Sequence, residues 1–290
     1  MRILVTGAKG QLGVELLAVL GHGHDVIGVD LPELDITTPE TARAVAETRP
    51  SWVVHAAAWT DVDGCERDPQ QAALVNTEGT RRVAAACRTV GAGLVYLSTD
   101  YVFDGRKGAP YLETDPVAPL SAYGRSKVGG EEVVRAVAPR WAIVRTAWLF
   151  GASGKNFVKT MVEKGAAGGP LRVVDDQVGS PTYARDLAKA IAELLSRDLT
   201  GTYHVTNAGS CSWHVFACAI LKEVGMAHVP VTPMRTAELG RPAPRPAFSV
   251  LANHAWAAAG LRPLRPWPDA LVSMLAAWKT TQDLPRLRNR

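Results

Sequence analysis

The chain has 290 residues, of which 47% are hydrophobic and 21% charged, a balance that is typical of globular proteins and excludes disordered and collagen-like chains. The net charge is only +4, and part of it lies in the segment 284–290, which carries three arginines and no acid, so we expect a solvated tail there and no nucleic-acid surface. The four cysteines form no Cys-x-x-Cys pair, the sequence opens without a signal peptide, and no apolar run reaches membrane-spanning length, which together predict a cytoplasmic protein without a membrane segment.

The first predicted element is a strand at 2–6, followed by glycines at positions 7, 10 and 13 and by an amphipathic helix at 14–20. In a dinucleotide-binding turn, glycines let the backbone bend and approach a pyrophosphate, and the helix N-terminus offers free N–H groups to the phosphates. The spacing here is Gly-x-x-Gly-x-x-Gly, whereas the better-known fingerprint is Gly-x-Gly-x-x-Gly. Taken alone, the turn is either a nucleotide site or an ordinary glycine-rich connection.

Short apolar runs then alternate with helical patterns. The runs lie at 24–30, 51–58, 92–100 and 140–150, and the helical patterns include 39–47 and 76–90. Because each parallel crossover needs a helix, the alternation predicts an α/β fold with a Rossmann-type, doubly wound parallel sheet. We assign residues 1–150 to this dinucleotide-binding domain.

After residue 150 glycine and proline become frequent, and the predicted elements are shorter. The pattern indicates strands and helices at 171–175, 182–195, 202–206, 213–224 and 267–278. We interpret 151–290 as a smaller, loop-rich substrate-binding lobe that is partly interleaved with the first domain. Ligands of open α/β sheets bind beyond the carboxyl ends of the strands, so we expect the site between the two parts.

The segment 98–134 carries the residues best suited to chemistry. Ser98 and Thr99 follow a predicted buried strand, and Tyr123 and Lys127 are four residues apart, which places them on one face of a helix. A nearby ammonium favours the phenolate, so we expect Lys127 to lower the Tyr123 pKa and Tyr123 to act as a general acid. A solvent-facing Tyr and Lys is the alternative. The order of the features along the chain, each at the end of a predicted strand or the start of a helix, favours the functional interpretation.

The chain resembles the extended short-chain dehydrogenase/reductases and, more narrowly, the dTDP-4-dehydrorhamnose reductase family. The resemblance extends over nearly the whole length and rests on GAKGQLGVEL, HAAAWTDVDGCE, STDYVFDG, YGRSKVGGE, VRTAWLFG, DDQVGSPTYARDLA and RPAFSVL. STDYVFDG and DDQVGSPT are typical of this family and not of the wider superfamily.

The resemblance implies hydride transfer from a reduced nicotinamide to C4 of a nucleotide-linked 4-keto-6-deoxyhexose. Tyr123 would protonate the ketone oxygen, Lys127 would bind the nicotinamide ribose, and Thr99 would hydrogen-bond the same ketone oxygen. A ketone that gains a hydride develops oxyanion charge, so it needs such a donor and proton source. The resemblance also places Asp100 and Trp148 at the sugar.

The cofactor would be NADPH or NADH. The residues that match the family's phosphate loop, adenosine and nicotinamide contacts are Gly7, Gly10, Gln11, Leu12, Gly13, Asp35, Ile36, Ala56, Ala57 and Ala58, together with Tyr123 and Lys127. Asp30 ends the second predicted strand, where a carboxylate accepts the ribose 2′-OH and favours NADH, whereas Lys9 could pair with the 2′-phosphate of NADPH. Use of both cofactors is compatible with this pair.

Several residues have two interpretations each. Arg245 and Lys159 are either ligands of the substrate or surface cations, and Arg245 would bind its diphosphate. Asn76 could order a water near Lys127, and His55 is interpreted as a core histidine.

Some relatives form dimers around magnesium. Glu15 matches one acidic position of those dimers, but Arg185 stands where another acid belongs. We therefore expect no metal, and a monomer or weak metal-independent homodimer.

Three functions stay open at this point. The first is reduction of dTDP-4-dehydro-L-rhamnose. The second is reduction of a related nucleotide sugar in antibiotic assembly, such as dihydrostreptose formation, with an epimerase as a further variant of the same chemistry. The third is a non-catalytic NADP-binding regulatory subunit, which the presence of Thr99, Tyr123 and Lys127 disfavours.

Overall fold

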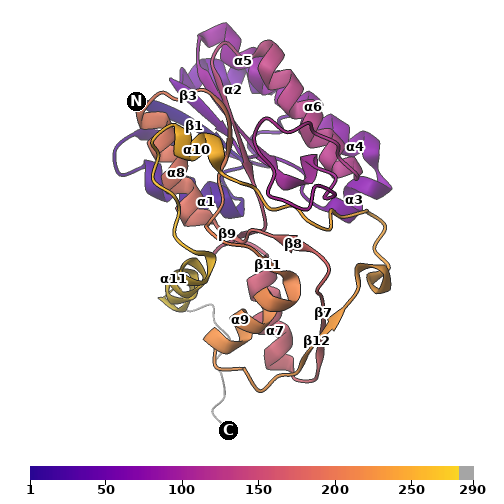
Figure 1. Ribbon diagram of the computed structural model, residues 1–290. Coiled ribbons are helices and arrows are strands. Elements are labelled where there is room, and N and C mark those ends of the chain that lie inside the picture. The colour runs from indigo at the N-terminus through magenta and orange to yellow at the C-terminus, as the bar shows by residue number, and fades with distance from the viewer. Residues whose placement is uncertain (281–290) are drawn as a thin grey trace.

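The computed structural model of the chain describes residues 1–280, which form two lobes joined by several chain crossings (Figure 1). The upper lobe in Figure 1 holds the large sheet, and the lower lobe is built from later parts of the chain. The arginine-rich segment 284–290, expected to be a solvated tail, lies outside the described residues.

The first lobe is built on six parallel strands in the order β10-β5-β4-β3-β1-β2. Their bounds are β1 (Arg2–Thr6), β2 (Asp25–Val29), β3 (Trp52–His55), β4 (Gly93–Thr99), β5 (Trp141–Thr146) and β10 (Gly201–His204). This order confirms the predicted Rossmann-type doubly wound sheet. The chain leaves β1 for β2 on one side and then for β3 and β4 on the other, so the order reverses between β1 and β3.

Helices cover both faces of the sheet because the strands are apolar on both faces. In β1, Ile3 and Val5 pack into one core and Leu4 into the opposite core, as the two-residue period of a strand requires. The first core is completed by α1 (Gln11–Leu20) and α8 (Ala184–Ser196). The second core is completed by α2 (Glu40–Thr48), α5 (Thr80–Val90) and α6 (Ala122–Val137). Short helices α3 (Val62–Arg67), α4 (Pro69–Ala73), η1 (Leu74–Gly79) and η2 (Asp100–Val102) line the rim near α6.

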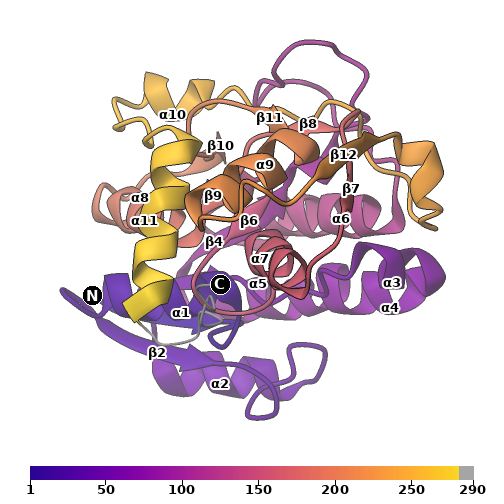
Figure 2. The ribbon, with the colours of Figure 1, turned by 90° about the horizontal axis from the view of Figure 1, so that it is seen from below.

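The second lobe has its own hydrophobic core, which is rich in aromatic side chains. Its elements are α7 (Phe157–Ala167), α9 (Trp213–Glu223) and α11 (Trp267–Thr280), with the strand pairs β6 (Leu149–Phe150) and β9 (Thr182–Tyr183), β7 (Leu171–Val174) and β12 (Val231–Met234), and β8 (Val178–Gly179) and β11 (Cys211–Ser212). Figure 2 looks onto this lobe from below, with α7, α9 and α11 in front of the large sheet.

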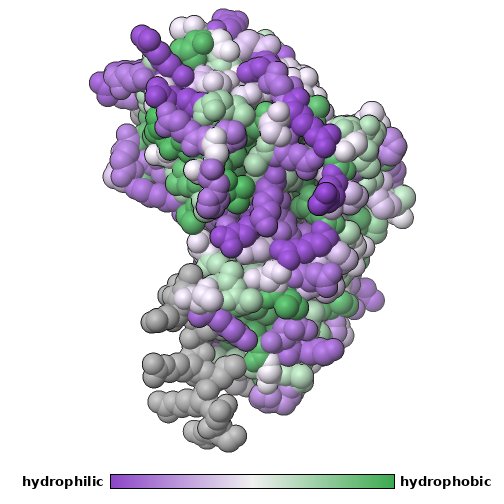
Figure 3. Space-filling view, turned by 90° about the vertical axis from the view of Figure 1, so that its left-hand side faces the viewer, coloured by the Kyte–Doolittle hydropathy of each residue, from purple (hydrophilic) through white to green (hydrophobic). Residues whose placement is uncertain are grey.

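Some later parts of the chain belong to the first lobe. Between elements of the second lobe the chain returns to the first, where α8 packs beside α1 and β10 extends the sheet next to β5. The remaining elements are η3 (Thr236–Leu239) and α10 (His254–Ala258), and α10 packs on β10. From the side, the outline narrows between the lobes, and hydrophilic and hydrophobic residues are interspersed over both (Figure 3).

Two predicted elements differ from the structure. The run at 140–150 is not one strand, because β5 ends where β4 ends, at the pair of Thr99 and Thr146, and Trp148 then adopts a left-handed backbone with φ 46°. The helix predicted from residue 76 begins earlier, as a π-helical turn at 74–79 that leads into α5. Within residues 1–280, none of the helices combines the length and hydropathy needed to cross a bilayer.

Candidate active site

Two cavities, each of about 600 Å³, lie at the carboxyl ends of the sheet strands, where the strand order reverses. They share Gly7, Gly10, Ala56 and Ala58 in their linings, so they are two parts of one groove. Of the residues singled out from the sequence, the first part is also lined by Asp30, Asp35, Ile36 and Ala57. The second part is also lined by Gln11, Leu12, Gly13, Thr99, Asp100, Tyr123, Lys127 and Trp148.

The glycine loop is shaped by close backbone contacts. Gly7 has φ 72°, and a Cβ there would lie 2.6 Å from the Ala57 backbone nitrogen, so the loop after β1 touches the end of β3. A Cβ on Gly13 would lie 2.1 Å from the Gly7 carbonyl oxygen, which means that α1 begins directly on the loop. Gly10 is the N-cap of α1 and carries no capping side chain. The first N–H groups of α1 are therefore available to an anionic ligand in the groove.

Charged groups lie where the two parts of the groove meet, with Asp30 in the lining of the first and Lys9 in that of the second. Asp30 accepts hydrogen bonds from the backbone N–H groups of Lys9 and Leu31, both at 2.8 Å, which hold its carboxylate beside the glycine loop. The Lys9 ammonium pairs with Glu33 at 2.7 Å, and both side chains are more than half exposed. Exposed pairs of this kind contribute little to stability, so Lys9 can exchange Glu33 for another anion.

The start of α6 places Tyr123 and Lys127 against the second cavity. Ser121 caps the helix by accepting from the Gly124 N–H at 3.1 Å, and Glu66 accepts from the Ala122 N–H at 2.7 Å. Both Tyr123 and Lys127 are buried and line the cavity. Two side chains thus satisfy the helix N-terminus, which fixes the direction of the helix face that carries the Tyr and the Lys.

Burial dominates the titration of this pair. It raises the pKa of Tyr123, partly offset by the Thr99 hydroxyl, and it lowers the pKa of Lys127 to about 7, partly offset by Glu131. The Lys127 ammonium lies 4.2 Å from the centre of the Tyr96 ring. The Tyr123 pKa thus lies above its ordinary value and not below it, as was expected from Lys127, because desolvation of the phenolate is the largest effect. The phenol is protonated at neutral pH, as a general acid must be.

Thr99 and Asp100 form a short hydrogen-bond chain next to Tyr123. The Thr99 hydroxyl donates to Asp100 at 3.0 Å and accepts from the Tyr101 backbone N–H at 3.2 Å. The Ser249 hydroxyl donates to the second Asp100 oxygen at 2.5 Å. Burial raises the pKa of Asp100 to about 6, although these hydroxyls favour its charged form. A ketone oxygen can thus receive the Thr99 proton only if that hydroxyl turns away from Asp100.

Trp148 has an aromatic partner that the sequence did not indicate. The Trp148 and Trp213 rings are stacked with centroids 3.5 Å apart and planes within 6°, and both residues line the second cavity. Trp213 opens α9, and Trp148 packs on the core of the same lobe, so the stack ties the segment that follows β5 to the second lobe beside the groove. A non-glycine residue with positive φ is uncommon and is enriched at functional sites, which marks Trp148. With eight tryptophans in the chain, no sequence signal identified which of them would pair.

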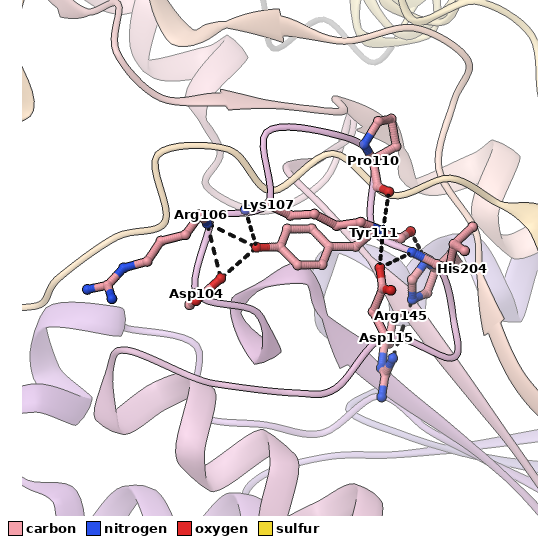
Figure 4. A network of polar contacts seen from close by, with 9 residues as sticks. Asp104, Arg106, Lys107, Pro110, Tyr111, Asp115, Arg145 and His204 are labelled. Atoms are coloured by element: carbon pink, nitrogen blue, oxygen red, sulfur yellow. Dashed lines mark hydrogen bonds and ion pairs between the residues drawn. The ribbon is translucent and has the colours of Figure 1, made fainter.

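The loop that follows Asp100 is anchored to the sheet (Figure 4). The Tyr111 hydroxyl donates to Asp104 at 2.7 Å and accepts from the Arg106 backbone N–H at 3.0 Å. The Tyr111 carbonyl oxygen lies 3.0 Å from Nδ1 of His204, the last residue of β10. These bonds hold the long connection between η2 and α6 in one conformation beside the groove.

Arg245 and Lys159 do not join the other predicted site residues. Burial would raise the pKa of Asp63, but hydrogen bonds from Arg245 at 3.0 Å and Arg241 at 2.7 Å hold it below its ordinary value. Arg245 is thus paired with α3 and interacts with Tyr101, which lines the second part of the groove, but Arg245 itself lines neither part. The Lys159 ammonium lies over the Trp278 ring at 5.3 Å, also outside the groove.

Two polar residues near the groove are bound within the protein. The Asn76 amide donates to the Trp59 carbonyl and to Ser126, and it accepts from the Trp59 N–H. It thereby joins η1 to α6. Both of its N–H groups are used, so only its carbonyl oxygen could bind the water expected near Lys127. His55 is buried, with its ring nitrogens bonded to Thr6 at 2.7 Å and Thr80 at 3.1 Å, which agrees with a core histidine.

The position considered for a metal holds an ion pair. Arg185 donates to the Glu15 carboxylate at 2.9 Å, so the guanidinium neutralises the acid that a cation would need. Within residues 1–280, no cluster of three or more His, Cys, Asp or Glu side chains could hold a metal ion.

Comparisons with known proteins agree with this geometry. A family model described as RmlD substrate binding domain matches residues 1–280. The chain is 47% identical to a Streptomyces griseus protein named dTDP-4-dehydrorhamnose reductase, over 95% of this chain and 93% of that protein. It is 46% identical to a Streptomyces antibioticus protein named probable dTDP-4,6-dihydroxy-2-methyloxan-3-one 4-ketoreductase, over 93% of each.

The fold is similarly close to solved structures. A dTDP-4-dehydrorhamnose reductase from Bacillus anthracis, crystallised in complex with NADP, has a TM-score of 0.93 and 41% identity, over 95% of this chain and 99% of that one. Since both the family model and these relatives extend over nearly the whole chain, the protein belongs to the RmlD family, and its resemblance to the dTDP-4-dehydrorhamnose reductases is confirmed.

Proposed function

We propose that this protein is an oxidoreductase that reduces the C4 ketone of dTDP-4-dehydro-L-rhamnose to dTDP-L-rhamnose with NADPH or NADH. The observation that carries the proposal is the joining of two cavities: a glycine-lined one at the N-terminus of α1, and one lined by Tyr123, Lys127 and Thr99. A dinucleotide that extends along the first part brings its reactive end to the buried phenol and ammonium in the second.

The glycine loop fits a dinucleotide. A side chain at Gly7 or Gly13 would collide with backbone atoms, so the loop is shaped for close approach, and Gly10 leaves the first N–H groups of α1 open to a pyrophosphate. When bound, the nicotinamide supplies the hydride. Asp35 and Ile36 would flank the adenine, and Ala56, Ala57 and Ala58 would pack along the bound cofactor.

The protein's own part in the reaction is to orient the ketone and supply a proton. Tyr123 gives its phenolic proton to the ketone oxygen, and burial keeps that proton in place at neutral pH until the oxygen gains charge. Thr99 donates a second hydrogen bond to the same oxygen after turning from Asp100. Lys127 holds the nicotinamide ribose, while Asp100 and Trp148 contact the sugar ring.

Use of both cofactors is supported by Asp30, which lines the first cavity, and Lys9, which lines the second. The Asp30 carboxylate, held by two backbone N–H groups, can accept the 2′-OH of NADH. Lys9 can leave the exposed pair with Glu33 and bind the 2′-phosphate of NADPH. NADP is the cofactor named for the Bacillus anthracis relative.

A second candidate function differs from the first only in the sugar of the substrate. The similarity to the Streptomyces antibioticus protein, named as a probable 4-ketoreductase of another dTDP-linked sugar, favours a related nucleotide sugar as the alternative.

We further propose a monomer or weak homodimer that needs no metal, because Arg185 occupies the cation's place beside Glu15. A cytoplasmic location is supported by four free cysteines at 65, 87, 211 and 218.

The test is the loss of reduced-nicotinamide absorbance when the protein is mixed with NADPH or NADH and dTDP-4-dehydro-L-rhamnose. We expect rapid oxidation by the wild type and loss of about 10²-fold or more in kcat for Tyr123→Phe, which removes only the proton donor. Tyr203→Phe, whose hydroxyl bonds the Thr200 carbonyl outside the groove, is the matched control and keeps wild-type activity. No oxidation by the wild type, with the cofactor bound, would refute the assignment of this sugar.

A further inference from the structure

A carboxylate lies buried behind the Tyr–Lys pair. Glu131 follows Lys127 by four residues in α6 and is completely buried. Side chains at this spacing are neighbours on one helix face, with Cβ atoms about 5–6 Å apart. Glu131 lines neither part of the groove and therefore would not touch the substrate or the cofactor.

The Glu131 carboxylate connects three elements that carry site residues. It accepts from the Ser98 hydroxyl at 2.6 Å, from Arg145 Nε at 2.8 Å and from Arg145 Nη2 at 2.7 Å. Ser98 precedes Thr99 in β4 and is paired in register with Arg145 in β5. The half-exposed Arg135 donates to the same carboxylate at 2.8 Å. One acid thus joins α6, β4 and β5 directly behind the site.

The contacts of Arg145 are complete. Its remaining nitrogen, Nη1, lies 3.4 Å from Nε2 of His204, whose Nδ1 lies 3.0 Å from the Tyr111 carbonyl oxygen (Figure 4). Burial and the charge of Arg145 lower the pKa of His204 to about 3, so this imidazole is neutral and accepts from Arg145. Ser98 on one side and His204 on the other therefore orient the buried ion pair of Glu131 and Arg145.

Lys127 has several titratable neighbours, but Glu131 is the one whose charge supports the ammonium. From β3, His55 is neutral, because burial and the charge of Lys127 lower its pKa to about 3. From β4, the Tyr96 phenol is buried and protonated, since burial raises its pKa. The groups that face the site from α6 and η2 are Tyr123, also protonated, and Asp100, which hydrogen-bonds Thr99 and Ser249. Burial lowers the pKa of Lys127, and Glu131 opposes this effect.

We propose that Glu131 is a positioning residue, which supports the charge of the Lys127 ammonium from one helix turn away and ties α6, the helix that carries Lys127, to the strand end that carries Thr99. The proposal rests on the function proposed above, in which Lys127 holds the nicotinamide ribose. A neutral Lys127 would lose one donor proton and its charge, and the ribose would be bound more weakly. Glu131 thereby sets the upper end of the pH range in which the enzyme works.

The test is to replace Glu131 with Gln and to follow the protonation of Lys127 directly. The midpoint of the Lys127 side-chain NMR titration, assigned with Lys127→Arg, needs neither cofactor nor sugar. Removing an opposite charge favours the neutral amine, so we expect the midpoint to fall by about one pH unit. The alkaline limb of the kcat/KM profile with NADPH and dTDP-4-dehydro-L-rhamnose should move to lower pH by the same amount.

Glu132 provides the matched control, because it is the adjacent acid of α6 and is exposed. Glu132→Gln should leave both the midpoint and the pH profile unchanged. If Glu131→Gln does not fold, the double variant Glu131→Gln/Arg145→Met removes the unpaired guanidinium, and replacing a whole buried ion pair is often tolerated. Because this change also removes a cation, its reference is Arg145→Met alone: the Lys127 midpoint of the double variant should lie below that of Arg145→Met, since the two differ only in the Glu131 charge.

Failure of the Glu131 proposal can be distinguished from failure of the proposed function. An unchanged Lys127 midpoint in folded Glu131→Gln, or a double variant with the same midpoint as Arg145→Met, would overturn the proposal, and so would an equal fall in Glu132→Gln. If the wild type does not oxidise NADPH with the sugar, the proposed function fails, while the NMR midpoint still decides the effect of Glu131 on Lys127.

Discussion

Substitution of Gly13 by alanine should disable the cofactor loop, although alanine is the better helix former. Gly13 is the third residue of α1, where the change would gain up to about 1 kcal/mol of helix propensity. Against this, the new Cβ would lie 2.1 Å from the Gly7 carbonyl oxygen and 2.7 Å from two Ala8 backbone atoms. Ordinary contacts of a Cβ begin near 3.4 Å, so the backbone must move by more than 1 Å.

The expected magnitude follows from the atoms involved. Flexible side-chain ends could rotate away, but the atoms met here belong to the loop itself, and overpacking of this kind costs about 1–3 kcal/mol or more. The steric cost therefore exceeds the propensity gain, and we expect a net loss of about 1–2 kcal/mol in the free energy of unfolding. The larger effect should be on NADPH binding, with an increase in Kd of more than about tenfold, which corresponds to 1.4 kcal/mol.

Urea unfolding and NADPH fluorescence titration measure the two effects. Gly23→Ala is the control, since a Cβ at Gly23 meets no atom within 4 Å, and it should leave Kd unchanged. A Gly13→Ala protein that binds NADPH as tightly as the wild type and unfolds at the same urea concentration would refute the argument that backbone contact requires glycine here.

Three further changes test the remaining parts of the site. Asp100→Asn should make stability depend less on pH. A carboxyl whose pKa is raised to about 6 in the folded state stabilises the fold below pH 4, and this contribution of up to about 3 kcal/mol is lost as the pH rises through 6. Urea unfolding of both proteins at pH 4 and pH 7 measures the difference, and an equal change in the free energy of unfolding between the two pH values would contradict the prediction. Glu33→Gln should free Lys9 and strengthen binding of NADPH but not of NADH, as fluorescence titration with each cofactor would show; an equal change for both would exclude a role for Lys9 at the 2′-phosphate. Trp213→Ala should raise KM for the sugar by up to about tenfold with little change in NADPH binding, because the stacking that holds Trp148 contributes about 0.5–1.5 kcal/mol. Steady-state kinetics measure KM, and an unchanged KM would mean that Trp148 keeps its position without Trp213.

The sequence by itself determined the features that depend on residues close together in the chain. The alternation of apolar runs and helical patterns specified the doubly wound sheet, since strand and helix periods are local. Gly7, Gly10 and Gly13 marked the loop after β1, and the four-residue spacing of Tyr123 and Lys127 placed both on one face of α6. Helix geometry alone accounts for the prediction about Tyr123 and Lys127.

Only the tertiary structure decided which distant groups meet. Trp148 stacks on Trp213, which is far away in the sequence, and Arg245 is paired with Asp63 instead of lining the groove. The sign of the Tyr123 pKa shift was also a tertiary property. The sequence shows an ammonium four residues away, but the extent of desolvation depends on every element packed around the phenol, and here desolvation raises the pKa. Periodicity reports the local backbone, whereas burial and pairing are settled by segments that are far apart in the chain and become neighbours only when it folds.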